Sequence, residues 1–361
     1  MGNCVARSEK EELSTFHRLY AHLLLKRARG IWHKQQLFPT LGLIYLEQLE
    51  CLLPEIEQEH RSKPFDLIWM EFSYLYPLVK VLRNSLPEAP VVCNAHNNEW
   101  ELQERTAGKY KTPLARAWGT LESDMLRYWE SQMLRECKLT FCCSKIDRQG
   151  LVNLEPECEE KIFVAPNGVD TDCFHTFKVA PNSESPLILF TGSASYGPNQ
   201  QAGKLLVEEI MPLVHHHSPH CRLRLAGRNA KAEWAHLQNG RDWLEVISDP
   251  PDMRPYFEDA DIFAVPLQYG GGTRLKILEA MSMGKPVIST SIGAEGLEVT
   301  PETDLILAES SESMASAILN LIQNKSLRES LGINARKLVE QKYQWSQITK
   351  AALTQLENAL D

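Results

Sequence analysis

The sequence lacks any apolar run long enough to cross a membrane. The longest, such as residues 187–190 and 262–267, fall far short of the ~20 residues of a spanning helix. Its nine cysteines show no Cys-x-x-Cys spacing and follow no secretory leader, so we expect a reducing cytoplasm. Positive charge is not in excess: the formal net charge is −9. Nucleic acid is therefore not an expected partner, and any anion site must be local.

What is present indicates two α/β domains. The chain has 361 residues, more than the ~100–200 of a typical domain, and its 43% hydrophobic residues suit a globular protein. Short apolar runs alternate with helical patterns, which is typical of βα units and parallel sheets. The expected strands are residues 66–72, 91–95, 139–144 and 162–165, then 187–191, 222–226, 244–247, 261–266, 286–290 and 305–308.

The segment between these two series predicts a domain boundary. Residues 179–186 are rich in Pro and Ser and lack periodicity, as expected of a linker. We expect Rossmann-like domains over residues 1–178 and 187–345, and a final helix over 346–361 that is able to cross back to the first domain. Residues 10–60 have a helical pattern, and the basic segment within residues 10–34 leaves open a peripheral contact with an anionic membrane, although a solvated helix end explains these charges as well.

The densest cluster of candidate binding residues follows the expected strand 261–266. Its members are Gly270, Gly271, Gly272, Thr273, Arg274, Leu275, Lys276 and Glu279. Glycines allow a ligand close to the backbone, and a helix start presents unpaired N–H groups with a positive dipole end. Arg274 and Lys276 add cations suited to a diphosphate, whereas Glu279 suits a neutral diol such as ribose. Taken alone, a glycine-rich turn with surface charges explains the pattern equally well.

Other motifs accompany this cluster. They are Pro166-Asn167-Gly168-Val169-Asp170 with Phe174, and Met283-Gly284-Lys285-Pro286-Val287. Together, from about residue 66 onward, the motifs resemble the retaining glycosyltransferases of family four. The resemblance implies the GT-B fold, with two Rossmann-like domains facing across a cleft. It also implies glycosyl transfer from a nucleoside diphosphate sugar to a saccharide or lipid-linked acceptor hydroxyl, with retention of configuration, in exopolysaccharide or cell-surface glycan assembly.

The site departs from the family pattern at two places. Glu279 matches the second carboxylate of the Glu-x7-Glu motif, the implied ribose ligand, but Gly271 stands at the first. The Arg and Lys that many members have after the first strand of this domain are also absent, since Gly192 is followed by Ser193, Ala194 and Ser195. Backbone N–H groups, Arg274 and Lys276 are therefore expected to replace the missing contacts. Two cations and a helix dipole supply the charge that a divalent ion would, so no metal and no other cofactor is expected.

Further candidates lie at other expected strand ends. His96-Asn97-Asn98-Glu99 resembles the family's His-Asn-x-Glu element, which implies that His96 contacts the donor while Glu99 orients it or binds acceptor. A single histidine there is otherwise a structural residue. Arg228 and Ser248 border the nucleotide in relatives, although Arg228 is equally well a solvated loop charge. Adjacent histidines at His215, His216 and His217 are expected on the surface rather than around a metal.

One absence favours an alternative function. Relatives begin with a strand and a glycine-rich loop, and this βα unit is expected to be missing from the chain. Together with Gly271, that absence motivates a catalytically silent nucleotide-sugar-binding or scaffold protein as the second hypothesis. A nicotinamide oxidoreductase is disfavoured, because no Gly-x-Gly-x-x-Gly follows an early strand.

Overall fold

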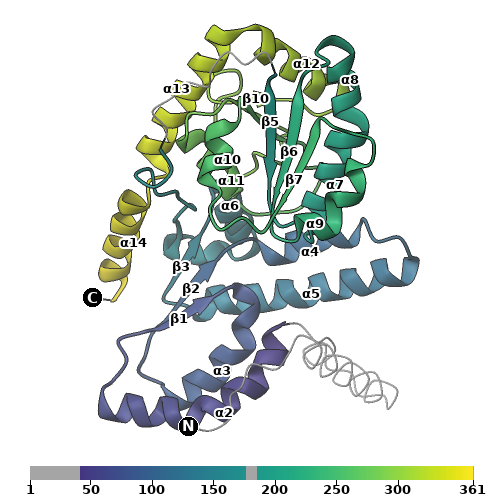
Figure 1. Ribbon diagram of the computed structural model, residues 1–361. Helices are drawn as coiled ribbons and strands as arrows, with labels where there is room; N and C mark the ends of the chain where they lie inside the picture. The colour runs from purple at the N-terminus through teal and green to yellow at the C-terminus, as the bar shows by residue number, and fades with distance from the viewer. Residues whose placement is uncertain (1–40, 176–184, 361) are drawn as a thin grey trace. The chain divides into compact units, whose positions relative to one another are not determined.

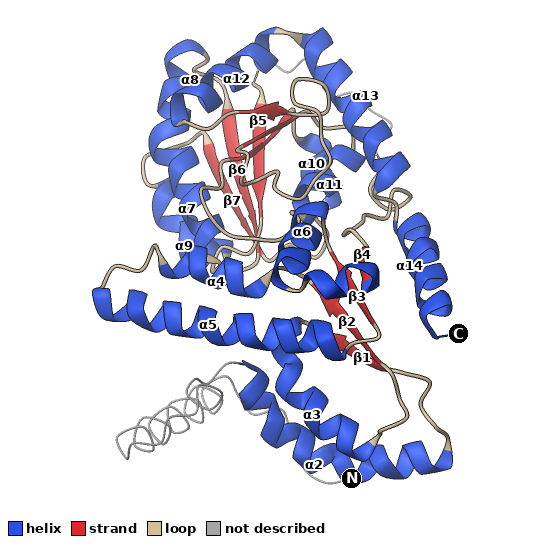
Figure 2. Cartoon of the chain, turned by 180° about the vertical axis from the view of Figure 1, so that it is seen from behind, coloured by secondary structure: helices blue, strands red, loops and turns tan. Residues whose placement is uncertain are grey.

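The computed structural model describes residues 41–175 and 185–360, which fold into two compact units, each around a parallel sheet (Figures 1 and 2). The first unit ends at Val164 and includes the residues from Leu356; the second runs from Ala165 to Gln355. The linker expected at 179–186 lies mostly outside the described residues, so that boundary stays a prediction. The same holds for the basic segment 10–34 and the missing first βα unit.

The sheet of the first unit has the order β1-β2-β3-β4. Its strands are β1 (Ile68–Glu71), β2 (Val91–Ala95), β3 (Leu139–Cys142) and β4 (Ile162–Val164). Buried and exposed residues alternate along β1, since Ile68 and Met70 join the core and Trp69 stays 42% exposed. Because side chains alternate between the two faces of a strand, Glu71 lies on the same face as Trp69, away from that core.

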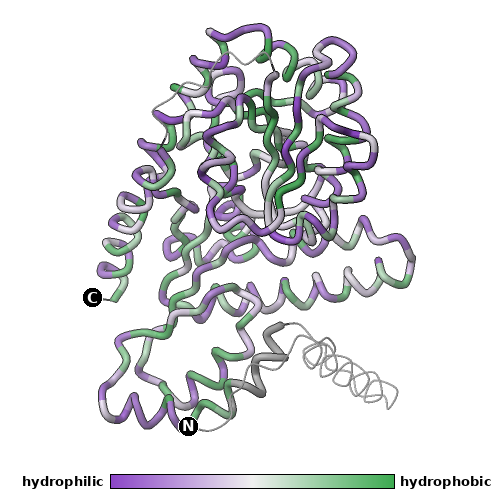
Figure 3. The backbone as a smooth tube through the Cα atoms, in the orientation of Figure 1, coloured by the Kyte–Doolittle hydropathy of each residue, from purple (hydrophilic) through white to green (hydrophobic). Residues whose placement is uncertain are grey.

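Helices connect these strands. They are α2 (Leu41–Ser62), η2 (Ser73–Leu75), α3 (Tyr76–Ser85), α4 (Glu99–Ala107), α5 (Pro113–Glu136), α6 (Lys145–Leu154) and η3 (Pro156–Lys161). The pair α4 and α5 lie side by side, and α5 alternates between hydrophobic and hydrophilic stretches (Figures 2 and 3). Gly119 permits this close packing, because a Cβ there would lie 2.5 Å from that of Ala107. Among the described residues, no helix combines the length and apolar character needed to span a bilayer.

The sheet of the second unit has the order β10-β9-β8-β5-β6-β7. Its strands are β5 (Leu187–Thr191), β6 (Arg222–Gly227), β7 (Leu244–Ser248), β8 (Ile262–Val265), β9 (Val287–Ser289) and β10 (Ile306–Leu307). All pairings are parallel. The strand order reverses direction between β5 and β8, and in sheets of this kind ligands bind beyond the carboxyl ends of the strands at such a switch point.

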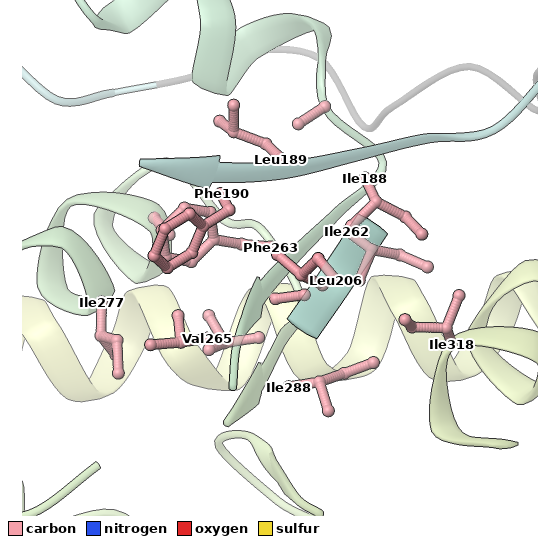
Figure 4. Packing of buried hydrophobic residues seen from close by; sticks show 14 of the residues in the cluster. Ile188, Leu189, Phe190, Leu206, Ile262, Phe263, Val265, Ile277, Ile288 and Ile318 are labelled. Atoms are coloured by element: carbon pink, nitrogen blue, oxygen red, sulfur yellow. The ribbon is translucent and has the colours of Figure 1, made fainter. Parts of the chain in front are cut away.

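The chain from β5 onward also forms helices, among them those that cover both faces of this sheet. They are α7 (Gly197–Leu205), η4 (Leu206–Ile210), α8 (Met211–His217), α9 (Ala230–Trp234), η5 (Ala235–Gln238), α10 (Arg254–Asp259), α11 (Leu275–Ser282), α12 (Ser311–Gln323), α13 (Lys325–Lys342) and α14 (Trp345–Leu360). Figures 1 and 2 show α7 and α8 on one side of the sheet and α10 and α11 on the other. Between the layers, Phe190, Phe263 and Ile277 are fully buried (Figure 4). A strand buried on both faces reads as a continuous apolar run, and all five residues of β5 are buried.

The turn that follows Ala165 is fastened to the end of the second unit. The Val169 N–H donates to the Tyr343 carbonyl at 2.8 Å, and Arg336 donates to the Phe174 carbonyl at 2.9 Å and to the Thr171 carbonyl at 3.2 Å. Gly168 has no room for a side chain, since a Cβ would lie 2.8 Å from the Ile348 Cδ1. The Pro-Asn-Gly-Val-Asp motif is thus a structural fastening of this unit.

Candidate functional site

The loop after β8 carries the glycine cluster to the switch point. Gly270 and Gly272 have φ values of 109° and 78°, a region that other residues rarely adopt. Arg274 precedes α11, is only 8% exposed, and donates from Nη1 to the Gly271 carbonyl. The Thr273 hydroxyl is buried and has no hydrogen-bond partner among the described residues. A buried hydroxyl without a partner beside a helix start suits an added acceptor such as a phosphate oxygen.

Lys276 links this loop to the loop after β5. Its Nζ donates to the Asn199 Oδ1 at 2.7 Å and lies 4.4 Å from the centre of the Phe190 ring. The Asn199 amide in turn donates to the Ser193 carbonyl at 2.9 Å. Gly192 leaves room for this bridge, because a Cβ there would lie 2.8 Å from the Lys276 Nζ. Asn199 was not among the sequence-based candidates, because it lies on α7, far from the motif it contacts.

The ionisable groups around this bridge have shifted pKa values. Burial, aided by the neighbouring Arg274, lowers the pKa of Lys276 to about 7, while Glu279 opposes that shift. Burial raises the pKa of Glu279, and Lys276 opposes that shift. The Glu279 carboxylate has no hydrogen-bond partner among the residues that the structure describes. This side of the site therefore offers a cation whose charge responds to a ligand and an acceptor able to bind hydroxyls.

The loop after β6 approaches the same place through its backbone. A Cβ on Gly227 would lie 2.0 Å from the Gly192 carbonyl oxygen, so the two strand ends nearly touch. The Ala194 N–H donates to the Arg228 carbonyl at 2.8 Å, whereas the Arg228 side chain is exposed. One strand further along, the Ser248 hydroxyl donates to the Asp249 carboxylate at 2.5 Å. Arg228 and Ser248 thus border the site, and Gly192, Ser193 and Lys276 form its centre.

The first unit holds the other candidates, His96 and Glu99. His96 follows β2, and its Nε2 lies 2.6 Å from the Glu71 Oε2 at the end of β1. The His96 ring stacks on Phe72, with centroids 4.2 Å apart. The carboxylate that contacts His96 is thus Glu71, which the sequence analysis did not single out although it ends a strand. Glu99 instead accepts from the Asn97 amide at 3.1 Å, and burial raises its pKa.

A buried carboxylate, Glu130, holds the segment after His96 in place. It accepts from the backbone N–H of Glu99 at 3.1 Å and of Trp100 at 2.9 Å, and from the Ser73 hydroxyl at 2.7 Å. Burial raises the pKa of Glu130 to about 8 against the effect of these bonds. Because the Asn98 side chain makes no capping bond, this carboxylate from α5 caps the start of α4.

In the histidine-rich segment, His216 and His217 are exposed, as expected, whereas His215 packs against its own unit. His215 Nε2 lies 2.7 Å from the Cys221 carbonyl oxygen, and its ring packs edge-on against Trp243. Two Asp-x-Asp triplets are also present, Asp170–Asp172 and Asp259–Asp261; Asp170 closes a backbone turn and Asp259 pairs with Arg224. Within the described residues, no three His, Cys, Asp or Glu side chains are grouped so as to hold a metal ion.

Sequence comparisons match both halves of the chain to families of sugar-transferring enzymes. A family described as Glycosyltransferase Family 4 matches residues 16–173, and one described as Glycosyl transferases group 1 matches residues 185–324. An "Uncharacterized 44.6 kDa protein in cps region" of Klebsiella pneumoniae is 22% identical over 353 residues, covering 92% of this chain and 86% of that protein. The capsular polysaccharide biosynthesis glycosyltransferase CapM of Staphylococcus aureus is 34% identical over 117 residues, covering 32% of this chain and 30% of CapM.

Structural comparisons agree on the fold. Anabaena Alr3699/HepE, solved in complex with UDP, has a TM-score of 0.67 at 15% identity and covers 87% of this chain and 84% of its own. Sucrose-phosphate synthase from Thermosynechococcus elongatus has a TM-score of 0.67 at 18% identity, and the match covers 88% of this chain and 79% of the synthase chain. These likenesses, with the two parallel sheets, confirm the expected GT-B, Rossmann-like fold.

Proposed function

We propose that this chain is a glycosyltransferase similar to those of family 4, and that it transfers a sugar from a nucleoside diphosphate sugar to an acceptor hydroxyl with retention of configuration. HepE was solved with UDP and with UDP-glucose, which makes a uridine diphosphate sugar the first donor class to test. The relatives named for a cps region and for capsular polysaccharide support a saccharide or lipid-linked acceptor in surface glycan assembly.

The bridge between the two loops at the switch point carries this proposal. Arg274 and Lys276 place positive charge beside the start of α11, where the buried Thr273 hydroxyl has no partner in the part of the chain that the structure describes. A diphosphate leaving group gains negative charge during transfer, and preorganised cations and backbone N–H groups stabilise it. Glu279 lies further along α11. Its carboxylate, which lacks a hydrogen-bond partner among the described residues, suits the ribose hydroxyls. No metal is assigned a role in this mechanism.

Donor turnover by the Arg274→Ala variant tests the site. We expect UDP or GDP to bind to the native chain in isothermal titration, and the variant to lose ~10²–10³ in kcat, because one cation of the leaving-group site is removed. Arg254→Ala is the matched control: Arg254 is exposed, pairs with Asp252 at 2.8 Å, and lies in the same unit.

Each other result has a definite meaning. Turnover insensitive to Arg274→Ala, with the fold intact by circular dichroism, would place the leaving group elsewhere. Nucleotide binding without turnover in any saccharide or lipid-linked acceptor screen would favour the silent binding protein. The anomeric configuration of the product, read by proton NMR, tests retention separately.

A further inference from the structure

The carboxylate of Glu71 is surrounded by three nitrogen groups. Oε1 lies 2.8 Å from the Trp69 indole nitrogen, and Oε2 lies 2.9 Å from the Asn94 amide and 2.6 Å from the His96 Nε2. Burial alone would raise the pKa of Glu71, but the bonds from His96, Trp69 and Asn94 outweigh it, so that the pKa is lowered. The group is therefore ionised at neutral pH and can only accept hydrogen bonds.

An acceptor-only carboxylate decides where the proton of His96 sits. A contact of 2.6 Å with an ionised oxygen requires an N–H, so Nε2 carries the proton. The Asn94 amide nitrogen also lies 3.4 Å from Nε2, but this longer contact competes poorly with its own 2.9 Å bond to Glu71. In the neutral ring, Nδ1 is then the nitrogen left to accept.

The ring is also held from the side. Phe72 stacks on His96 with an interplanar angle of 28°, and on Tyr74 with centroids 5.0 Å apart. Phe72 has a φ of 74°, a conformation that a residue with a side chain rarely adopts and that persists only where its surroundings impose it. Both Glu71 and Phe72 thus belong to the end of β1 and act on one imidazole, which is itself 33% exposed.

We propose that Glu71 is a positioning residue for glycosyl transfer: it fixes His96 in the Nε2–H tautomer and in one orientation, so that Nδ1 accepts a hydrogen bond from a substrate hydroxyl. This proposal rests on the proposed function. It assigns to Glu71 the orienting role expected for Glu99, whose carboxylate bonds to Asn97 instead. A neutral, fixed Nδ1 suits a substrate hydroxyl, which can donate a hydrogen bond to it. It does not suit a phosphate oxygen, because Nδ1 and that oxygen would both be acceptors.

Nitrogen-15 NMR of histidine-labelled protein, without substrate, tests the tautomer. We expect the neutral ring of His96, assigned by the loss of its signals in His96→Asn, to show a protonated Nε2 and an unprotonated Nδ1. In Glu71→Gln, the side chain keeps its volume but presents either a carbonyl or an amide group to the ring. The two tautomers should then mix. An Nδ1–H tautomer in the native chain would overturn the proposal.

Steady-state kinetics on the same variants test the positioning role. We expect Glu71→Gln to lower kcat by about 10-fold or more with little change in the KM for the sugar donor. The reason is that Nδ1 of His96, once misplaced, impairs transfer rather than binding of the sugar donor. Trp69→Phe is the matched control, since it removes another donor to Glu71 but leaves the His96 contact; its kcat should stay within about 2-fold.

The two readouts separate the possible failures. A mixed tautomer in Glu71→Gln with an unchanged kcat would reduce the contact to a structural one and so refute the positioning role. A native tautomer as expected, with no transfer by the native chain to any acceptor, would refute the proposed function and this inference with it. If Glu71→Gln fails to fold, Glu71→Asp, which keeps the charge but shortens the reach, takes its place with the same expectations.

Discussion

At the scale of single residues, the charge of Lys276 depends strongly on its surroundings. Its pKa is lowered to about 7, mainly by burial, so about half of the molecules carry the charge near neutral pH. A bound diphosphate would favour the charged form and raise this pKa again. Nucleotide binding should therefore take up a proton above pH 7 and weaken as the pH rises through that value.

Calorimetry of UDP binding in two buffers of different ionisation enthalpy measures this uptake. We expect proton uptake at pH 8 for the native chain and none for Lys276→Met, with UDP bound about 10-fold or more weakly by the variant at pH 6. Lys204→Met serves as the control, because Lys204 is exposed and pairs with Glu208. Equal proton uptake in native chain and Lys276→Met would assign the titration to another group.

Two glycines with positive φ allow the cost of steric crowding to be measured apart from the cost of backbone strain. Gly227 has a φ of 148° and abuts the Gly192 carbonyl, whereas Gly240 has a φ of 72° and no atom within 4 Å of the place that a Cβ would occupy. Gly227→Ala should cost more than about 3 kcal/mol of unfolding free energy, and Gly240→Ala about 1 kcal/mol. Urea unfolding of both variants checks this. Similar losses would mean that the β5 and β6 ends can move apart.

At the scale of secondary-structure elements, the start of α4 depends on a side chain from α5. Glu130 satisfies two backbone N–H groups of α4 that no local cap reaches. Glu130→Ala should therefore lower the free energy of unfolding by about 1–3 kcal/mol, the cost of leaving buried donors without partners. Asp124→Ala, an exposed position on the same helix, should change it by less than about 0.5 kcal/mol in the same urea titration.

The pH dependence of this cap has a definite sign. The pKa of Glu130 is raised from 4.5 to about 8. Between these pH values the folded chain therefore holds a proton that the unfolded chain has lost. Stability from this group is complete below pH 4.5 and is lost as the pH rises through 8. Comparing melting temperatures of the native chain and Glu130→Ala across that range measures it. A difference between the two that does not vary with pH would show that Glu130 stays ionised.

Elements were predicted better than their contacts. The runs 91–95 and 187–191 form strands with the expected bounds, and the other expected strands are present with ends that differ by one or two residues. Strands buried on both faces form nearly continuous apolar runs, so their positions can be predicted from a sequence. By contrast, Glu71 meets His96, and Asn199 meets Lys276, only through the register of neighbouring strands and helices. Residue types and spacing along the chain do not encode that register.

At the scale of the whole molecule, the peripheral membrane contact that the sequence left open has a candidate surface in the first unit. The loop between α4 and α5 and the start of α5 expose Lys109, Lys111 and Arg116 together with Leu114, which is 81% exposed. Each cation near an anionic surface contributes about 1 kcal/mol, and an exposed leucine adds apolar contact. The basic segment within residues 10–34, for which this contact was expected, lies outside the described residues.

Vesicle sedimentation tests the described surface. The native chain should bind vesicles containing phosphatidylglycerol and not those of phosphatidylcholine alone, and Lys109→Glu with Lys111→Glu should weaken binding by about 10-fold or more. Lys337→Glu with Lys350→Glu changes the net charge equally at exposed positions of α13 and α14. Equal loss in both double variants would show a dependence on net charge alone.

The fastening of residues 168–174 affects where the chain can be cut. A fragment starting at Leu187, where the linker was expected to end, would leave Arg336 without two of its carbonyl acceptors and Tyr343 without the Val169 amide. It would also uncover Ile348, which packs against Gly168. Anyone preparing the second unit alone should begin at Ala165, and should expect the shorter piece to be aggregation-prone.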